Sequence, residues 1–293
     1  MNTADCRQSH PAHEVTKPDA NTLPRRIWTL WAQGLAHMPA VPRACVETWT
    51  AHNPDWDVKI LTAETLHHWV DPLLCEPAAN SLRPYRLSEL ARVNLLARHG
   101  GVWVDATCYC MKPLDQWLAD CLDSSFFAFS RPGPDRLMAS WFLASPSNGY
   151  IPSRLWDTLY RYYLGHDFSD TGWRQLARRA LDKTLNHSTR TTSLWFAPPL
   201  PQLKISPYLS FHYKFTDLTR VDPAFREIWN KTATISADGP HSLQFHGLDR
   251  PPSPEILADF AQQRVPLYKL DWRVDPSALS ASSTLRALLA QTA

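Results

Sequence analysis

The chain has 293 residues, of which 44% are hydrophobic and 20% are charged, and its formal net charge is +2. This length is enough for one large domain with a sizeable core, and the composition excludes a disordered chain or a polyelectrolyte. The nearly neutral charge argues against a dedicated nucleic-acid-binding protein. No run of about 18 apolar residues occurs, and the first residues are polar where a signal peptide would be apolar, so we expect a soluble, cytoplasmic protein.

The six cysteines form no CxxC pair and have no histidine at zinc-finger spacing, which argues against a structural zinc site. We expect reduced thiols. Cys108 and Cys110 lie two residues apart, so on a strand they would share one face. Small buried hydrophobic side chains are the favoured interpretation of this pair over a redox couple.

Strands and helices alternate at the start of the chain. Residues 26–31 and 57–61 have the pattern of short strands, and 40–52 and 63–70 have the pattern of helices, with Thr62 as the cap of the second helix. This β-α-β-α order predicts an α/β fold with a mainly parallel central sheet flanked by helices.

A single domain is expected over residues 24–273, because no internal repeat or linker interrupts it. Residues 1–23 are predicted as a polar N-terminal tail. Residues 274–293 are predicted as a C-terminal tail or a short helix.

A helix, a glycine pair, a short strand and an aspartate follow one another over residues 88–105. Ser88 suits the N-cap of the helix, and Gly100 suits the left-handed residue that ends it. Residues 102–104 are a β-prone run, which places Asp105 at the carboxyl end of a strand. Open α/β sheets bind ligands at that end, although an aspartate there can also simply cap the following turn.

Glu89 and Arg92 lie three residues apart on the predicted helix. At this spacing they either face one cleft or pair as a surface salt bridge.

Several segments, in order, match blocks of one known family. They are LPRRIWTLWAQG (23–34), VETWTAHNPDWDVKILT (46–62), RLSELARVNLLARHGGVWVDAT (86–107), MASWFLAS (138–145), SPYLSFHYKF (206–215) and VPLYKLDWR (265–273). On these residues the chain resembles the capsular-polysaccharide-synthesis type of glycosyltransferase, which is related to retaining sugar transferases with a DxD motif.

The resemblance implies a GT-A fold and transfer of a sugar from a nucleotide-sugar donor, a UDP- or GDP-sugar, to a growing glycan or a lipid-linked acceptor in capsule or polysaccharide biosynthesis. A lipid-linked acceptor would require peripheral association with the inner face of the membrane. The reaction is expected to be of the retaining type.

The resemblance also implies a divalent cation, Mn²⁺ or Mg²⁺, that stabilises the charge of the leaving diphosphate. Asp105 matches the first DxD aspartate, and Thr107 replaces the second carboxylate, so we expect both as metal ligands. A third ligand is expected from a late histidine, for which His212 is favoured over His246. Arg92 matches the family arginine near the diphosphate or ribose, and with Asp105 it forms the predicted catalytic pair.

Donor contacts are predicted from the matched blocks. Glu89 stands where relatives carry an aspartate expected to bind donor-sugar hydroxyls, and Lys269 is a candidate diphosphate contact, with an ordinary solvated lysine as the alternative. Segments 123–135 and 166–200 are turn-rich and are predicted as specificity loops. The full predicted donor-binding set is Trp28, Trp31, Ser88, Glu89, Arg92, Gly101, Lys269 and Trp272.

Two further classes of function remain as alternatives. The loss of the second carboxylate at Thr107 would also suit a catalytically impaired nucleotide- or glycan-binding subunit of a polysaccharide-synthesis complex. A Rossmann oxidoreductase is disfavoured, because no GxGxxG turn follows the first strand.

Overall fold

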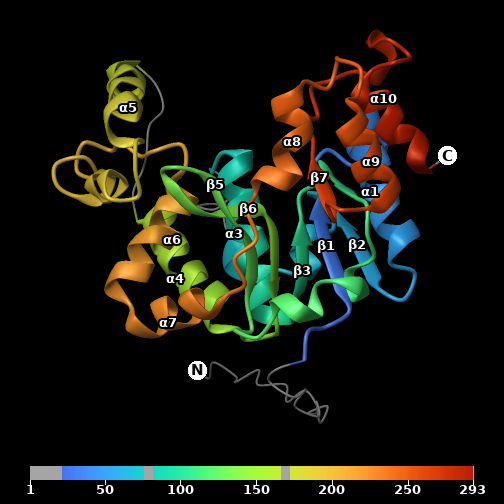
Figure 1. The fold of residues 1–293 in the computed structure, drawn as a ribbon. Coiled ribbons are helices and arrows are strands. Elements are labelled where there is room, and N and C mark those ends of the chain that lie inside the picture. The colour runs from blue at the N-terminus through green and yellow to red at the C-terminus, as the bar shows by residue number, and fades with distance from the viewer. Residues whose placement is uncertain (1–21, 76–81, 166–171, 293) are drawn as a thin grey trace, which may run out of the picture.

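A five-stranded sheet lies at the centre of the molecule, with helices on both faces (Figure 1). The structure is a computed structural model, and it describes residues 22–75, 82–165 and 172–292. The strand order is β2-β1-β3-β6-β5, and a separate two-stranded sheet pairs β4 with β7. The strands are β1 (Arg26–Leu30), β2 (Asp57–Leu61), β3 (Gly101–Val104), β4 (Cys108–Cys110), β5 (Phe127–Gly133), β6 (Arg136–Ser145) and β7 (Leu267–Lys269).

The central sheet is mainly parallel, as predicted. Strand β1 pairs in parallel with β2 and with β3. Strand β6 pairs antiparallel with β3 on one side and with β5 on the other, so β5 runs in the direction of β3 and only β6 is reversed.

Helices cover the two faces of the sheet. The α-helices are α1 (Ala40–His52), α3 (Pro84–His99), α4 (Tyr150–Leu164), α5 (Gly172–Leu185), α6 (Ser210–Val221), α7 (Pro223–Lys231), α8 (Asp238–His246), α9 (Pro254–Gln262) and α10 (Thr284–Leu289). In Figure 1, α4, α6 and α7 lie on one side of the sheet, α1 and α8 to α10 lie on the other, and α5 extends away from the body.

The alternation of side chains along the strands divides the core into two parts. On β3, Trp103 packs with helices α3, α4 and α6, whereas Val102 and Val104 pack with α1 and β4. This follows from the two-residue period of a strand. Cys108 and Cys110 are buried on the same face of β4 in the second of these clusters, which confirms their interpretation as small core residues.

Two helix predictions need correction. The helix over 40–52 is confirmed, but 63–70 forms only a 3-10 turn at Leu66–His68. Thr62 and Thr65 exchange side-chain and backbone hydrogen bonds, which close this segment into a turn, and Pro72 follows shortly after.

Helix α3 begins earlier than predicted, at Pro84 with Arg83 as its N-cap, so Ser88 lies inside it. Proline is favoured in the first turn, because its missing N–H has no helical partner there. The predicted end at Gly100 is confirmed, with φ +65°.

The predicted specificity loops contain regular structure. Much of 123–135 is strand β5, and 166–200 contains α5 and a 3-10 segment at Thr191–Phe196; within the latter range, 166–171 lie outside the described residues. The aromatic and apolar residues at the start of β5 pack in the core. At the C-terminus α10 forms the predicted short helix, and Leu285 and Leu288 are completely buried against α1, α8 and α9. The predicted N-terminal tail lies almost entirely outside the described residues.

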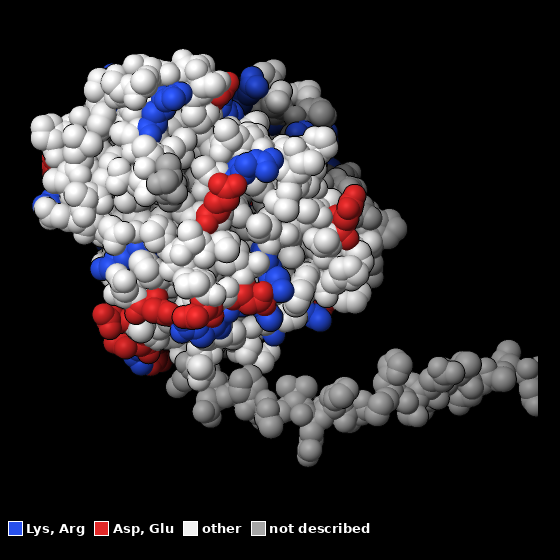
Figure 2. All heavy atoms as spheres, turned by 90° about the vertical axis from the view of Figure 1, so that its right-hand side faces the viewer, with Lys and Arg blue, Asp and Glu red and all other residues white. Residues whose placement is uncertain are grey.

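The surface of the α1 and α9 side is shown in Figure 2. Acidic and basic side chains gather in a mixed band along its lower edge, and the rest of this face carries few charges. In the described part of the chain, no helix combines the length and apolar character needed to cross a bilayer.

Candidate active site

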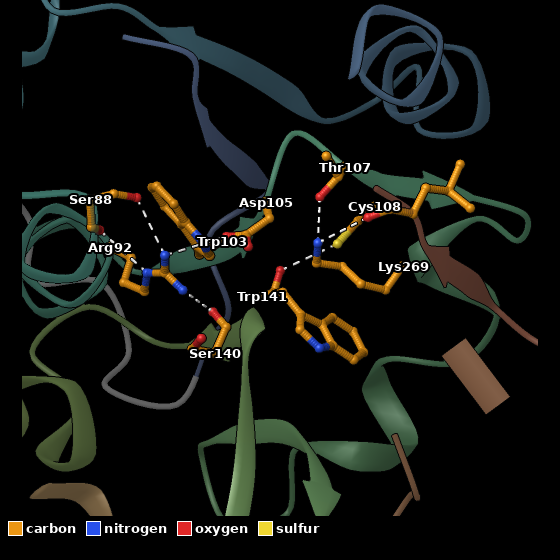
Figure 3. Close-up of polar contacts among 10 residues, drawn as sticks. Ser88, Arg92, Trp103, Asp105, Thr107, Cys108, Ser140, Trp141 and Lys269 are labelled. Carbon is orange, nitrogen blue, oxygen red and sulfur yellow. Dashed lines mark hydrogen bonds and ion pairs between the residues drawn. The ribbon is translucent and has the colours of Figure 1, made fainter. Parts of the chain in front are cut away.

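Asp105 lies directly after the carboxyl end of β3, as predicted (Figure 3). Its backbone N–H donates to the carbonyl of Trp141 at 2.9 Å, which ties the turn to β6. The carboxylate oxygen Oδ1 accepts a hydrogen bond from the indole of Trp103 at 3.0 Å and lies 3.5 Å from Nη2 of Arg92. The side chain is 29% exposed, so the carboxylate is both anchored and open to a ligand.

Arg92 is held by the chain on several sides. Its Nη1 donates to the carbonyl of Ser140 at 2.6 Å, and its Nε and Nη2 donate to the carbonyl and hydroxyl of Ser88, both at 3.3 Å. The guanidinium also lies over the ring of Trp103, 5.1 Å from its centroid. The side chain is only 7% exposed, so Arg92 is a fixed positive charge beside Asp105.

Lys269 reaches the same edge from the end of β7. Because β7 pairs with β4 in a register that sets Lys269 opposite Cys108, its ammonium lies beside the turn that follows Asp105. Nζ donates to Oγ1 of Thr107 at 2.5 Å and to the carbonyl of Leu270 at 3.2 Å. In Figure 3, Asp105 lies between Arg92 on one side and Lys269 on the other.

An aromatic pair borders this edge. Trp31 follows the carboxyl end of β1 and packs with Ala106, the residue after Asp105. The ring of Trp272 meets Trp31 edge to face at 6.4 Å and is 53% exposed. The structure therefore brings two of the predicted donor-binding tryptophans together beside Asp105.

The model of the capsular polysaccharide synthesis protein family matches residues 3–171, which include α3, β3 and Asp105. The chain belongs to this family. The match ends before α6 and β7, so it does not include His212 or Lys269.

Two curated relatives of this family member carry glycosyltransferase names. The chain is 22% identical over 162 residues to O-glycosyltransferase braB of Annulohypoxylon truncatum, covering 46% of the chain and 38% of the relative. It is 25% identical over 179 residues to glycosyltransferase afumC of Aspergillus fumigatus, covering 55% of the chain and 43% of the relative. The chain thus spans about two fifths of the length of the curated relatives that it matches.

Among solved structures, the chain is similar to the PaToxG glycosyltransferase. The identity is 12%, the TM-score is 0.38, and the alignment covers 72% of this chain and 88% of that one. A similarity this distant carries no argument about the fold.

Two predicted donor-binding residues serve the fold of this family member instead. Trp28 is completely buried, and its indole donates to the carbonyl of Gly100 at 2.8 Å, so the donor-contact prediction for Trp28 is wrong. Gly101 opens β3, at the end of the strand opposite Asp105, and a Cβ there would lie 2.4 Å from the carbonyl oxygen of Arg26. Gly101 permits close strand packing and does not face the site. The match to the family blocks does not distinguish residues that stabilise the fold from residues that contact the donor.

Ser88 acts through Arg92. Its hydroxyl and carbonyl accept hydrogen bonds from the guanidinium, so its place in the site is that of a positioning residue.

The three predicted metal ligands do not fit a cation held by the protein. Among the residues that the structure describes, no three His, Cys, Asp or Glu side chains group as ligands. The hydroxyl of Thr107 is hydrogen-bonded by an ammonium group, whose charge would repel a cation. His212 is buried in α6, and burial, together with the charges of Arg136 and Arg92, lowers its pKa to about 3. These three residues therefore fit a protein-held cation poorly.

Glu89 is buried beside the site. Its Oε2 accepts a hydrogen bond from the hydroxyl of Tyr163 at 2.6 Å, and that hydroxyl also lies 2.8 Å from the hydroxyl of Ser210. Burial raises the pKa of Glu89 to about 7, although Tyr163 and the nearby Arg92 oppose the shift. Oε2 of Glu89 is thus occupied by the buried hydroxyl of Tyr163. The contact between Glu89 and a donor hydroxyl remains a prediction for the other carboxylate oxygen.

This raised pKa predicts a pH dependence of stability. Between pH 4.5 and about 7 the folded state keeps the Glu89 proton that the unfolded state has lost, so the free energy of unfolding should fall as pH rises. Glu89→Gln should lack this pH-dependent part of the free energy of unfolding, which we expect to be on the order of 2–3 kcal/mol between acidic and mildly alkaline pH. Urea unfolding at pH 5 and pH 8 measures it. The exposed Glu47→Gln is the control, and equal pH slopes in Glu89→Gln and the wild type would refute the prediction.

Several residues of the site were not predicted from the sequence. Ser140 acts through its backbone carbonyl, for which the sequence carries no signal. Tyr163 from α4 donates to Glu89, and Ser210 from α6 is hydrogen-bonded to Tyr163; both lie far from Glu89 in the chain. The indole N–H of Trp103 donates to Asp105, a contact that the β-prone character of residues 102–104 does not predict.

Proposed function

We propose that this protein is a glycosyltransferase of the GT-A type that moves a sugar from a UDP- or GDP-sugar to a glycan or a lipid-linked acceptor, with retention at the anomeric carbon. Membership of the capsular polysaccharide synthesis family and the glycosyltransferase names of its relatives support the transferase class. The observation that carries the proposal is the anchored but accessible carboxylate of Asp105, with Arg92 and Lys269 on its two sides, at the carboxyl edge of the sheet.

The charges at this edge suit the chemistry of sugar transfer. When the bond between the anomeric carbon and the phosphate oxygen breaks, negative charge grows on the nucleoside diphosphate and positive charge on the sugar ring. In this proposal Lys269 would bind the diphosphate, and the Asp105 carboxylate would favour the positive charge on the ring. Arg92 holds the Asp105 side chain in place.

For the nucleotide base we propose the exposed ring of Trp272, with Trp31 behind it. An aromatic face stacks on any base, so this contact would supply affinity without choosing between uracil and guanine.

For the acceptor we propose a cavity of about 450 Å³ at the turn between β5 and β6, whose polar lining consists of Arg131, Arg136, Thr189 and Asp238. Asp238 of this lining lies in α8 about one turn before His241, whose ring packs on Trp141 at 5.5 Å. Burial and the charges of Lys269 and Arg136 lower the pKa of His241. A cavity with hydroxyl, carboxylate and guanidinium groups suits a saccharide.

Thermal unfolding with UDP, GDP, CMP and their sugars tests the donor class. A ligand at about 100 times its dissociation constant adds roughly 2.7 kcal/mol to the stability of the folded state, which gives a clear rise in Tm. We expect a rise with one nucleotide class only, and no rise with any of them would contradict a nucleotide-sugar donor. A rise in Tm with a nucleotide, but no release of diphosphate in the presence of acceptor glycans, would favour the alternative of a catalytically impaired nucleotide-binding subunit.

A further inference from the structure

The Lys269–Thr107 contact bears on how the leaving diphosphate would be neutralised. Thr107 lies two residues after Asp105, where the second carboxylate of the DxD-like motif would stand. Its hydroxyl is occupied by the ammonium of Lys269 at 2.5 Å. A positive charge is thus already built into the place where the second carboxylate of the motif would otherwise attract a cation.

The backbone fixes Lys269 in this place. Strands β4 and β7 pair antiparallel, and the N–H of Leu270 donates to the carbonyl of Thr107 at 2.8 Å, which locks the two segments together. An ammonium has three donors. Thr107 and the carbonyl of Leu270 take two of them, and no described residue accepts the third, which leaves it for a ligand.

Cys108 links Lys269 to Asp105. It lies opposite Lys269 in the register of β4 against β7, and its backbone N–H donates to the carbonyl of Asp105 at 2.9 Å. A diphosphate bound at Lys269 would sit beside Asp105, where its attached sugar would lie.

We propose that the ammonium of Lys269 takes the place of a divalent cation, so that this enzyme binds and cleaves its donor without a metal. The inference rests on the proposed glycosyltransferase function. The bond between the anomeric carbon and the β-phosphate oxygen breaks, and its electron pair stays on that oxygen. The acceptor hydroxyl oxygen bonds to the anomeric carbon, and its proton passes to the departing diphosphate. Lys269 stays protonated throughout and stabilises the diphosphate by charge and hydrogen bonding.

Calorimetric titration with UDP and with GDP tests the proposal without relying on activity. The full-length protein is titrated in chelator and again in Mg²⁺ or Mn²⁺, together with Lys269→Gln, which removes the charge, and Lys269→Arg, which keeps it. Lys231→Gln is the matched control, because Lys231 is an exposed lysine on α7 that pairs with Glu227. Thermal unfolding without nucleotide shows whether each variant is folded.

We expect one nucleotide to bind the wild type with equal affinity in chelator and in metal. Lys269→Gln should weaken this binding by about 10- to 100-fold, the loss of one charge-assisted hydrogen bond, and Lys269→Arg should restore most of it. Lys231→Gln should bind like the wild type.

Three results would overturn the proposal. Loss of wild-type binding in chelator would overturn it, whatever the lysine variants do, and so would metal-free binding that Lys269→Gln leaves unchanged. Both results would leave the glycosyltransferase function standing. Failure of the wild type to bind UDP or GDP under any condition would remove the proposed donor site, and the inference with it.

Discussion

Asp105→Asn is expected to lower the release of nucleoside diphosphate from the sugar donor by about 10²- to 10³-fold, the usual effect of removing one well-placed electrostatic group from an active site. The side chain keeps its shape, and Trp103 can still donate to the remaining carbonyl oxygen. Only the negative charge beside the sugar ring is lost. Binding of UDP or GDP alone should persist, because in this account the diphosphate is held by Lys269 and not through a metal on Asp105.

The matched control for this variant is Asp120→Asn, since Asp120 is exposed on a 3-10 segment and takes no part in the site. Diphosphate release is measured for both variants with the donor class that raises the unfolding temperature. Wild-type rates in Asp105→Asn would show that Asp105 has only a structural role. Loss of nucleotide binding together with activity would indicate that a metal on Asp105 holds the diphosphate.

Gly101→Ala is expected to lower the free energy of unfolding by about 3–5 kcal/mol, which is large for a single methyl group. The residue has φ +96°, where side chains other than glycine are strained. The added Cβ would also lie 2.4 Å from the carbonyl oxygen of Arg26, so β1 and β3 would have to separate. Those are the strands that carry Trp31 and Asp105 to the same edge.

Gly34→Ala separates the two causes. Gly34 has a similar φ of +85°, but a Cβ there would meet nothing within 4 Å, so this variant has the backbone strain without the collision. We expect it to cost about 1–2 kcal/mol. Urea denaturation of both variants makes the comparison, and equal losses at the two positions would contradict the steric explanation.

The sequence predicted the elements whose signals are local. The short strand before Asp105 alternates between two core faces, and Gly100 ends α3 as its conformational freedom suggests. The prediction failed where a tertiary or competing local interaction decides the outcome. The threonine turn at Thr62 shortens the helix predicted over 63–70, and the turn-rich appearance of 123–135 hid the strand β5, whose stability comes from its pairing with β6.

Only part of the candidate site could be predicted from the sequence, because some of its contacts depend on tertiary structure. Asp105, Arg92 and Lys269 lie in matched blocks, and the structure brings all three to one edge. The blocks could not show that Trp28 is fully covered or that Lys269 would bind Thr107 across 162 positions of the chain. That contact depends on the register of β4 against β7, which no local pattern encodes.

A crystal structure of the protein with the sugar nucleotide that most raises its unfolding temperature would show directly where the donor binds. We expect diphosphate oxygens within hydrogen-bonding distance of Nζ of Lys269, the sugar beside the carboxylate of Asp105, and the base against Trp272. A nucleotide bound elsewhere, such as in the cavity beside Arg131 and Arg136, with the Asp105 edge empty, would contradict it.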